Sequence, residues 1–208
     1  MTYAVAAAFA VMCVCYAWFQ RIKRTPGHSR TLEITVKCGA TAMAVLVAGL
    51  GAMVHGTTAG WLMLAGLAVC AAADGVLCVY FVPGGALFAL GHVLYMTAFC
   101  LMQPPTWESA VVFAVLMGLI SIGFYRFRKE IGPQRMKLAY AYAGVLSVMA
   151  AMAAPQKPLY TIGALLFVFS DATLGYLLLG KKNDRLDYIS LGAYYLGQFL
   201  LGLAVFVG

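Results

Sequence analysis

Eight apolar stretches of about 20 residues divide this chain, and they constrain its fold more than any other feature. A helix that spans the hydrocarbon core of a bilayer needs about that many mostly apolar residues. Only 10% of the 208 residues are charged, against roughly 25% in ordinary soluble domains. The sequence therefore predicts an all-α, polytopic membrane protein, a single domain of eight transmembrane helices over residues 1–208. The helices are expected at residues 3–19, 34–54, 58–81, 84–101, 107–127, 136–153, 159–180 and 188–207.

The basic residues predict the orientation of these helices. All but one of the 14 Lys and Arg residues lie in or beside the connections after the first, fifth and seventh segments, the exception being Lys157. Because cytoplasmic loops retain positive charge, both termini are expected outside. The net charge of +7 thus reflects topology, and no nucleic-acid partner is expected. The first segment carries its basic residues after its apolar run, which predicts a retained helix rather than a cleaved signal. The short loops favour a bacterial inner-membrane protein.

Two aspartates lie inside these apolar segments, Asp74 in the third and Asp171 in the seventh. Each has a Gly eight residues before it and a Leu three residues after it. A carboxyl group in hydrocarbon costs about 3 kcal/mol even on lenient insertion scales. Two such groups in matching contexts indicate a function for both.

The matching contexts also suggest an internal repeat. The two segments are four helices apart, and since four is even, two four-helix halves over residues 1–105 and 106–208 would run parallel. The expected counterparts are Lys37 with Lys137, His92 with Tyr195, and Tyr95 with Gln198.

Counting the helical rise predicts that the polar residues share one depth. Asp74 and Asp171 each lie about 14 Å from the cytoplasmic end of their helix. His92, Tyr195 and Gln198 fall near the same level on the fourth and eighth segments. In low dielectric one of two neighbouring carboxyl groups is held protonated while the other stays ionised, which is the arrangement of an acid–base pair. The plainer alternative is that each aspartate is neutral and holds neighbouring helices together.

The other polar residues have plain alternatives as well. His92 and Tyr95 share a helix face with two phenylalanines, where a histidine is often a simple core residue. Tyr195 and Gln198 share one helix face, and the plain alternative there, an interfacial aromatic belt, suits Tyr188 and to a lesser degree Tyr194 better than it suits Gln198. Near the cytoplasmic ends of their helices, two lysines can either extend to lipid headgroups or bind a substrate phosphate: Lys37 and Lys137.

Several function classes lack their motifs. The chain has no GxSxG, HExxH, P-loop or GxGxxG sequence, which disfavours serine lipases, zinc proteases and nucleotide-driven pumps. Its six cysteines lack CxxC spacing and its three histidines are far apart, so no metal or other cofactor is expected. A GxGD aspartyl protease is disfavoured because Ala73 precedes Asp74. A proton-coupled transporter or lipid-handling protein remains the main alternative to an enzyme, and a non-catalytic scaffold is a further one.

Five pieces of the chain carry these polar residues in order: Lys37 and residues 73–77, 88–95, 169–171 and 194–198. Together they resemble the YhhN/TMEM86 family, whose characterised members are lysoplasmalogenases. Two departures are that this chain has Cys38 where the family usually has Pro, and Ala73 where it usually has Gly. Neither departure removes a proposed chemical group. The matching pieces span most of the chain: Lys37, Ala73-Asp74-Gly75-Val76-Leu77, Phe88-Ala89-Leu90-Gly91-His92-Val93-Leu94-Tyr95, Phe169-Ser170-Asp171 and Tyr194-Tyr195-Leu196-Gly197-Gln198.

The resemblance implies hydrolysis of the vinyl ether bond of lysoplasmalogens to a fatty aldehyde and a glycerophospho-ethanolamine or -choline. It maps the two family aspartates, thought to be catalytic, onto Asp74 and Asp171. A vinyl ether is hydrolysed by protonation of its β-carbon, which an aspartic acid can perform while a second aspartate stabilises the cation. The expected partners are therefore a lysophospholipid-like substrate and membrane lipids. The expected substrate-binding residues are His92, Tyr95, Tyr195, Gln198, Lys37 and Lys137.

Overall fold

The computed structural model describes residues 2–181 and 183–208, and over these residues the chain forms nine α-helices and no β-strand. Eight of them are long and apolar enough to cross a membrane, which confirms the predicted number of spans. The ninth, α6, is a four-residue helix inside a basic connection. The helices are α1 (Thr2–Arg24), α2 (Arg30–His55), α3 (Thr58–Leu77), α4 (Phe81–Met102), α5 (Trp107–Arg126), α6 (Arg128–Ile131), α7 (Pro133–Ala153), α8 (Pro158–Leu178) and α9 (Asp184–Val207).

Local sequence signals explain where the helices begin and end. Gly56 ends α2 with a left-handed backbone (φ 63°), and Thr57 then caps α3 by accepting a hydrogen bond from Gly60 N. The predicted break at residues 82–85 is wrong, because α3 ends at Leu77 and Pro83 lies in the first turn of α4. Proline is tolerated there because the first turn of a helix has no acceptor for its backbone N–H.

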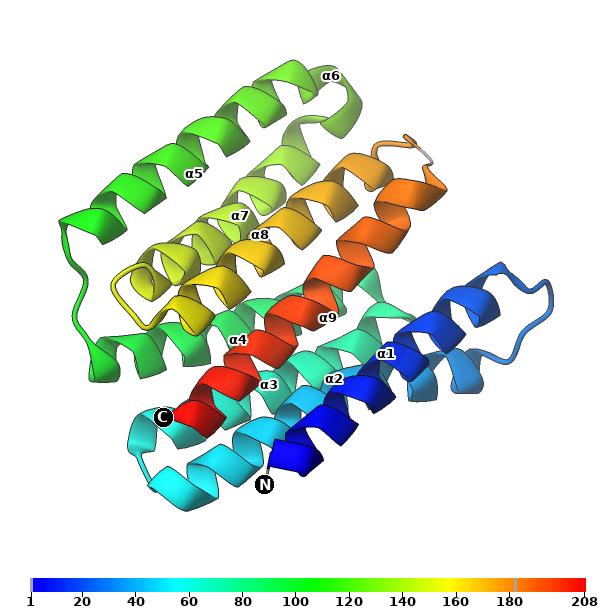
Figure 1. Cartoon of the computed structure of the whole chain (residues 1–208). Helices are drawn as coiled ribbons and strands as arrows, with labels where there is room; N and C mark the ends of the chain where they lie inside the picture. Colours follow the sequence, from blue (N-terminus) through cyan, green and yellow to red (C-terminus); the bar gives the residue numbers. More distant parts are fainter. Residues whose placement is uncertain (1, 182) are drawn as a thin grey trace.

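Six helices pack in a closed order, which we call the ring: α2 on α3, α3 on α4, α4 on α7, α7 on α8, α8 on α9, and α9 back on α2 (Figure 1). Helix α1 lies outside the ring against α2 and α9, and α5 lies outside it against α7. The two termini lie at the same end of the bundle. The interior of the ring is therefore the most lipid-shielded part of the molecule.

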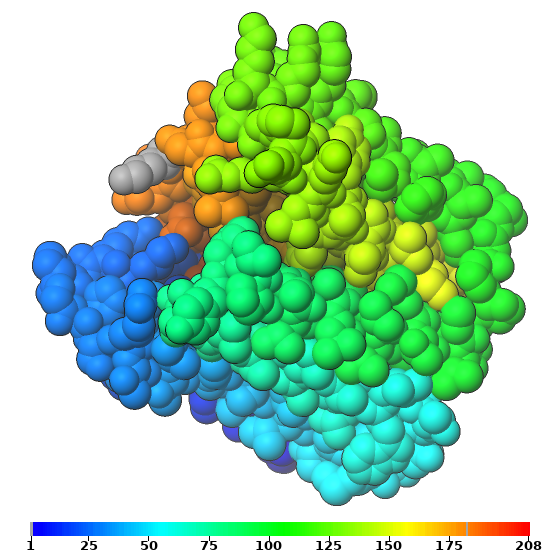
Figure 2. Space-filling model, turned by 180° about the vertical axis from the view of Figure 1, so that it is seen from behind, coloured from blue at the N-terminus to red at the C-terminus, as the bar shows by residue number. Residues whose placement is uncertain are grey.

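The basic residues gather at the end of the bundle opposite the termini. Every described Lys and Arg except Lys157 lies in the connections at that end or within two helical turns of them, whereas Lys157 contacts the backbone carbonyl of Gly208. Lys182, part of the predicted cytoplasmic cluster, lies outside the described residues. Figure 2 shows the surface hollowed at the basic end, between the start of α4, α7 and the segment joining α8 to α9. The outside location of the termini stays a prediction.

Glycines bring two helix pairs into similar close contact. A Cβ on Gly66 of α3 would lie 3.1 Å from Gly91 O of α4, and one on Gly163 of α8 would lie 3.0 Å from Gly197 O of α9. Gly66 and Gly163 each stand eight residues before an aspartate. If these two contacts are matched, Gly91 corresponds to Gly197. The pairing of His92 with Tyr195 suggested by the sequence would instead match Gly91 with Tyr194, three residues earlier. The repeat itself stays a prediction, and these contacts are what support it.

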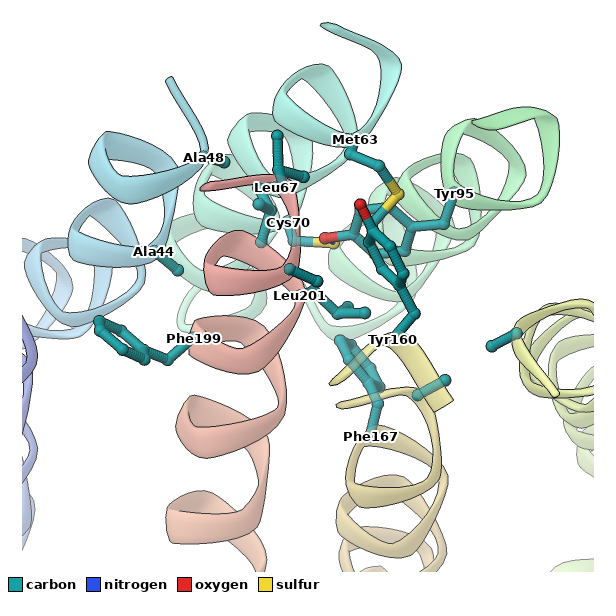
Figure 3. Packing of buried hydrophobic residues seen from close by; sticks show 14 of the residues in the cluster. Ala44, Ala48, Met63, Leu67, Cys70, Tyr95, Tyr160, Phe167, Phe199 and Leu201 are labelled. Atoms are coloured by element: carbon teal, nitrogen blue, oxygen red, sulfur yellow. Dashed lines mark hydrogen bonds between the residues drawn. The ribbon is translucent and has the colours of Figure 1, made fainter. Parts of the chain in front are cut away.

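One apolar cluster fills the ring. Met63, Leu67 and Cys70 of α3 meet Tyr95 of α4, while Tyr160 and Phe167 of α8 close on them from the opposite half (Figure 3). All of these side chains are buried. In this interior an unpaired polar group is expensive, so the contacts of each polar side chain there are informative.

Candidate active site

Asp74 on α3 is the most completely enclosed charged group among the described residues, with 1% of it exposed. Its Oδ2 accepts hydrogen bonds from Thr41 Oγ1 on α2 (2.5 Å) and from the Tyr194 hydroxyl on α9 (2.6 Å). Its Oδ1 lies 3.3 Å from the Lys37 ammonium, one turn before Thr41 on α2. Two helices of the ring, α2 and α9, thus supply three donors to a carboxyl group carried by a third helix, α3.

The donors around Asp74 continue as a chain of hydrogen bonds across the ring. The Tyr95 hydroxyl on α4 donates to Gln198 Oε1 at 2.9 Å, and Gln198 Nε2 donates to the Tyr194 hydroxyl at 3.3 Å. Tyr194 in turn donates to Asp74. Each of these side chains is buried, so the chain satisfies their polar atoms and fixes the orientation of all four.

Asp171 on α8 has a simpler environment. Its Oδ2 accepts a hydrogen bond from the Tyr142 hydroxyl on α7 at 2.5 Å, and the residue is half-buried rather than enclosed. Packed aromatic rings lie between the two carboxyl groups: Tyr142, the donor to Asp171, lies 6.3 Å from His92, and His92 packs on Phe167, whose ring lies 5.3 Å from that of Tyr194. The two carboxyl groups are therefore connected through one layer of buried rings but are held by different partners.

His92 on α4 lies between the two groups of hydrogen bonds. It is fully buried, and neither ring nitrogen has a hydrogen-bond partner within the described part of the chain. Its ring packs edge-on against Phe167 of α8 at 4.5 Å and lies 6.0 Å from the ring of Tyr95 and 6.3 Å from that of Tyr142, centroid to centroid. A buried imidazole without partners is costly, so a polar group of a ligand that forms a hydrogen bond with His92 would be strongly favoured here.

The structure brings most of the predicted site residues together. Lys37, Asp74, Tyr95 and Gln198 are linked directly or through the hydrogen-bond chain, and His92 lies beside it. The Tyr195 hydroxyl donates to the Lys37 carbonyl at 3.5 Å, so its hydrogen bond is to the backbone of the cluster, while its ring lies 5.1 Å from that of Tyr194.

Lys137 is not brought to the cluster. It is exposed on α7, and none of the hydrogen bonds or ion pairs found among the described residues involves its side chain. Lys37 lies seven residues after the start of α2 and is turned toward α3, whereas Lys137 lies four residues after the start of α7 and stays on the surface.

Three residues of the cluster were not predicted from the sequence as site residues: Thr41, Tyr142 and Tyr194. The assignment of Tyr194 to an interfacial belt is wrong, because it is 5% exposed and donates to Asp74. A usable signal was present for Thr41, which follows Lys37 by one helical turn and so shares its face. Tyr142 carries no comparable signal.

The ion pair gives a prediction for Lys37→Met. Removing one partner of a buried pair leaves an uncompensated charge and costs about 3–5 kcal/mol. We therefore expect Lys37→Met to lower stability by that amount, measured by unfolding in detergent, and the double variant Lys37→Met/Asp74→Asn to regain most of it. The matched control is Lys137→Met at the exposed position, expected within about 0.5 kcal/mol of the parent protein. Equal stability of both single variants would argue against the pair.

The fold and this cluster define a class: multi-pass helical membrane proteins that enclose a hydrogen-bonded carboxyl group in a ring of helices. The sequence profile of the YhhN family matches residues 32–205, and the chain therefore belongs to the YhhN family. The match covers all six helices of the ring together with α5, apart from a few terminal residues, and leaves out α1.

Among curated proteins, the chain is similar to the lysoplasmalogenase TMEM86B of Sus scrofa, with 28% identity over 145 residues. The aligned part is 68% of this chain and 62% of that protein. The chain thus matches less than two thirds of the length of this relative. No solved structure matches the chain significantly.

Proposed function

We propose that this protein is an intramembrane hydrolase that cleaves the vinyl ether bond of lysoplasmalogens. The observation that carries the proposal is the enclosed Asp74, connected to Asp171 through buried aromatic rings, in a chain of the YhhN family. The similarity to a protein named lysoplasmalogenase supports the substrate class. We further propose a bacterial inner membrane as its location, which the short loops favour.

The proposed reaction needs an acid, an anion and a polar contact for the substrate. Protonation of the vinyl ether β-carbon gives an oxocarbenium ion, water adds to it, and the resulting hemiacetal separates into a fatty aldehyde and an alcohol. Carboxyl groups at Asp74 and Asp171 supply the proton and the negative charge. His92, with two unsatisfied nitrogens, and the polar chain of Tyr95 and Gln198 are suited to orient water or the ether and glycerol oxygens.

The headgroup would lie at the basic end of the bundle. Because the charge of Lys37 is neutralised by Asp74, we propose that Lys37 fixes this carboxylate rather than the phosphate. Phosphate contacts then fall to exposed basic residues such as Lys137. The lysolipid chain would lie along apolar helices, as membrane lipids do.

The direct test is turnover by the purified protein in detergent. We expect release of fatty aldehyde from lysoplasmenyl-ethanolamine or -choline, and no release from the saturated alkyl ether analogue, which cannot form the oxocarbenium ion by protonation. Detergent removes any transmembrane gradient, so turnover would also exclude a transporter without enzymatic activity. Absence of turnover with both headgroups would contradict the proposed function.

A further inference from the structure

The two carboxyl groups differ in the number of donors that hold them. Asp74 has three donors, Thr41, Tyr194 and the cation of Lys37, and it is sealed from solvent. Asp171 has one donor, Tyr142, on one oxygen, and it is half-buried. An ionised carboxylate has about four acceptor positions, so burial favours ionisation of the group with more donors. This asymmetry separates the roles of the two residues.

Lys37, the one buried Lys or Arg among the described residues, strengthens the difference. If Asp74 were neutral, Lys37 would be left charged and unpaired in the interior, which is strongly destabilising. Within the described residues no Lys, Arg or His forms an ion pair with Asp171, so a proton on Asp171 leaves no charge uncompensated. With one cation in this interior, paired to Asp74, the most favourable arrangement is an ionised Asp74 and a protonated Asp171.

We propose that Asp171 is the proton donor of the reaction, that Tyr142 is its positioning residue, and that Asp74 remains ionised as a fixed counter-charge. This assignment rests on the proposed function, which by itself leaves open which aspartate is the acid. Tyr142 holds Oδ2 of Asp171, so the proton is carried by Oδ1, the oxygen left for a substrate. Asp171 is also the carboxyl group with exposed surface, as contact with a substrate requires.

The chemical step balances with this one proton. Asp171 transfers its proton to the β-carbon, the carbon–carbon π bond supplies the electron pair, and the oxocarbenium ion forms with Asp171 as carboxylate. Water then attacks the cationic carbon and returns a proton to Asp171, which gives a neutral hemiacetal. Its collapse breaks the carbon–oxygen bond and yields aldehyde and alcohol. The negative charge of Asp74 is constant throughout and stabilises the cation electrostatically.

Infrared spectroscopy of the ligand-free protein tests the assignment without turnover. A protonated carboxyl group has a carbonyl stretch that a carboxylate lacks, and the chain has only seven Asp and Glu residues. At neutral pH we expect this band in the parent protein and in the double variant Lys37→Met/Asp74→Asn, and its loss in Asp171→Asn. The double variant removes the cation with its partner, so no unpaired charge disturbs Asp171. A parent protein without the band, or a band lost in the double variant and kept in Asp171→Asn, would overturn the assignment.

Tyr142→Phe tests the positioning role. We expect it to shift the frequency of the Asp171 band and to lower kcat about fivefold to tenfold, the effect of one hydrogen bond, with KM unchanged. The control is Tyr140→Phe, two residues away on α7, where the ring packs on Phe124 instead; it should change neither quantity. An unshifted band in Tyr142→Phe would reject the role. Since the band is read without substrate, an inactive parent protein with the expected spectra would count against the proposed function alone.

Discussion

Asp171→Asn and Asp74→Asn are each expected to lower the rate of aldehyde release by about 10²–10⁴-fold or more, while both proteins remain folded in detergent. Asparagine has nearly the shape of aspartate and keeps an oxygen that can accept from Tyr142 or from Thr41 and Tyr194. It cannot donate a carboxyl proton or carry a negative charge. Both variants therefore remove the chemistry with little change in shape. Because Asp74→Asn also leaves the Lys37 cation unpaired, Lys37→Met/Asp74→Asn is measured beside it and should be equally inactive.

The measurement is aldehyde formation under saturating substrate, with size-exclusion chromatography as the check on folding. Asp184→Asn is the matched control, because Asp184 is exposed in the first turn of α9, and it should retain full activity. Substantial activity in either aspartate variant would show that two-aspartate catalysis is wrong.

Gly51→Ala and Gly202→Ala are expected to be the most destabilising small substitutions in the chain, each by about 3 kcal/mol. These glycines lie where α2 meets α9 and the ring closes. A Cβ on Gly51 would lie 2.5 Å from Phe206 Cα, and a Cβ on Gly202 would lie 2.5 Å from Ala44 O. Both obstacles are backbone atoms, which cannot rotate away as a side chain can. The helices would have to separate, and Tyr194 on α9 would move away from Asp74.

Unfolding in detergent measures this effect, and Gly118→Ala on α5 is the control. A Cβ on Gly118 meets nothing within 4 Å, so alanine there should be neutral or stabilising by up to about 1 kcal/mol because of its better helix propensity. If all three variants behaved alike, close backbone contact between α2 and α9 would not be what holds the ring together.

The number of spans could be predicted from the sequence because the bilayer fixes the length of a helix that crosses it. The order in which the helices pack could not. In lipid, a helix such as α4 is apolar on every side, so hydrophobicity does not reveal which face meets a neighbour. The contact of α2 with α9 depends instead on where small residues such as Gly51 and Gly202 allow the backbones to approach closely.

The same reasoning separates the site residues that were found from those that were not. A carboxyl group in an apolar segment is costly enough to attract notice, which is why Asp74 and Asp171 stand out. A hydroxyl group costs far less, so Tyr142 and Tyr194 do not stand out in the same way, and Thr41 could be found only from its position one turn after Lys37. Their importance depends on which helix each faces, and that follows only from the packing.

The closure of the ring by α9 has a consequence for how the protein is made. When synthesis has reached the end of α8, both aspartates, Lys37 and Thr41 are present in the nascent chain, but the 24 residues of α9 are not. Tyr194 and Gln198 are still missing, and α2 has no neighbour on its open side. Of the six helices of the ring, α9, which completes the enclosure of the site, is therefore synthesised last. A chain released before α9 would carry the Lys37–Asp74 pair with an incomplete set of donors and an open side toward lipid.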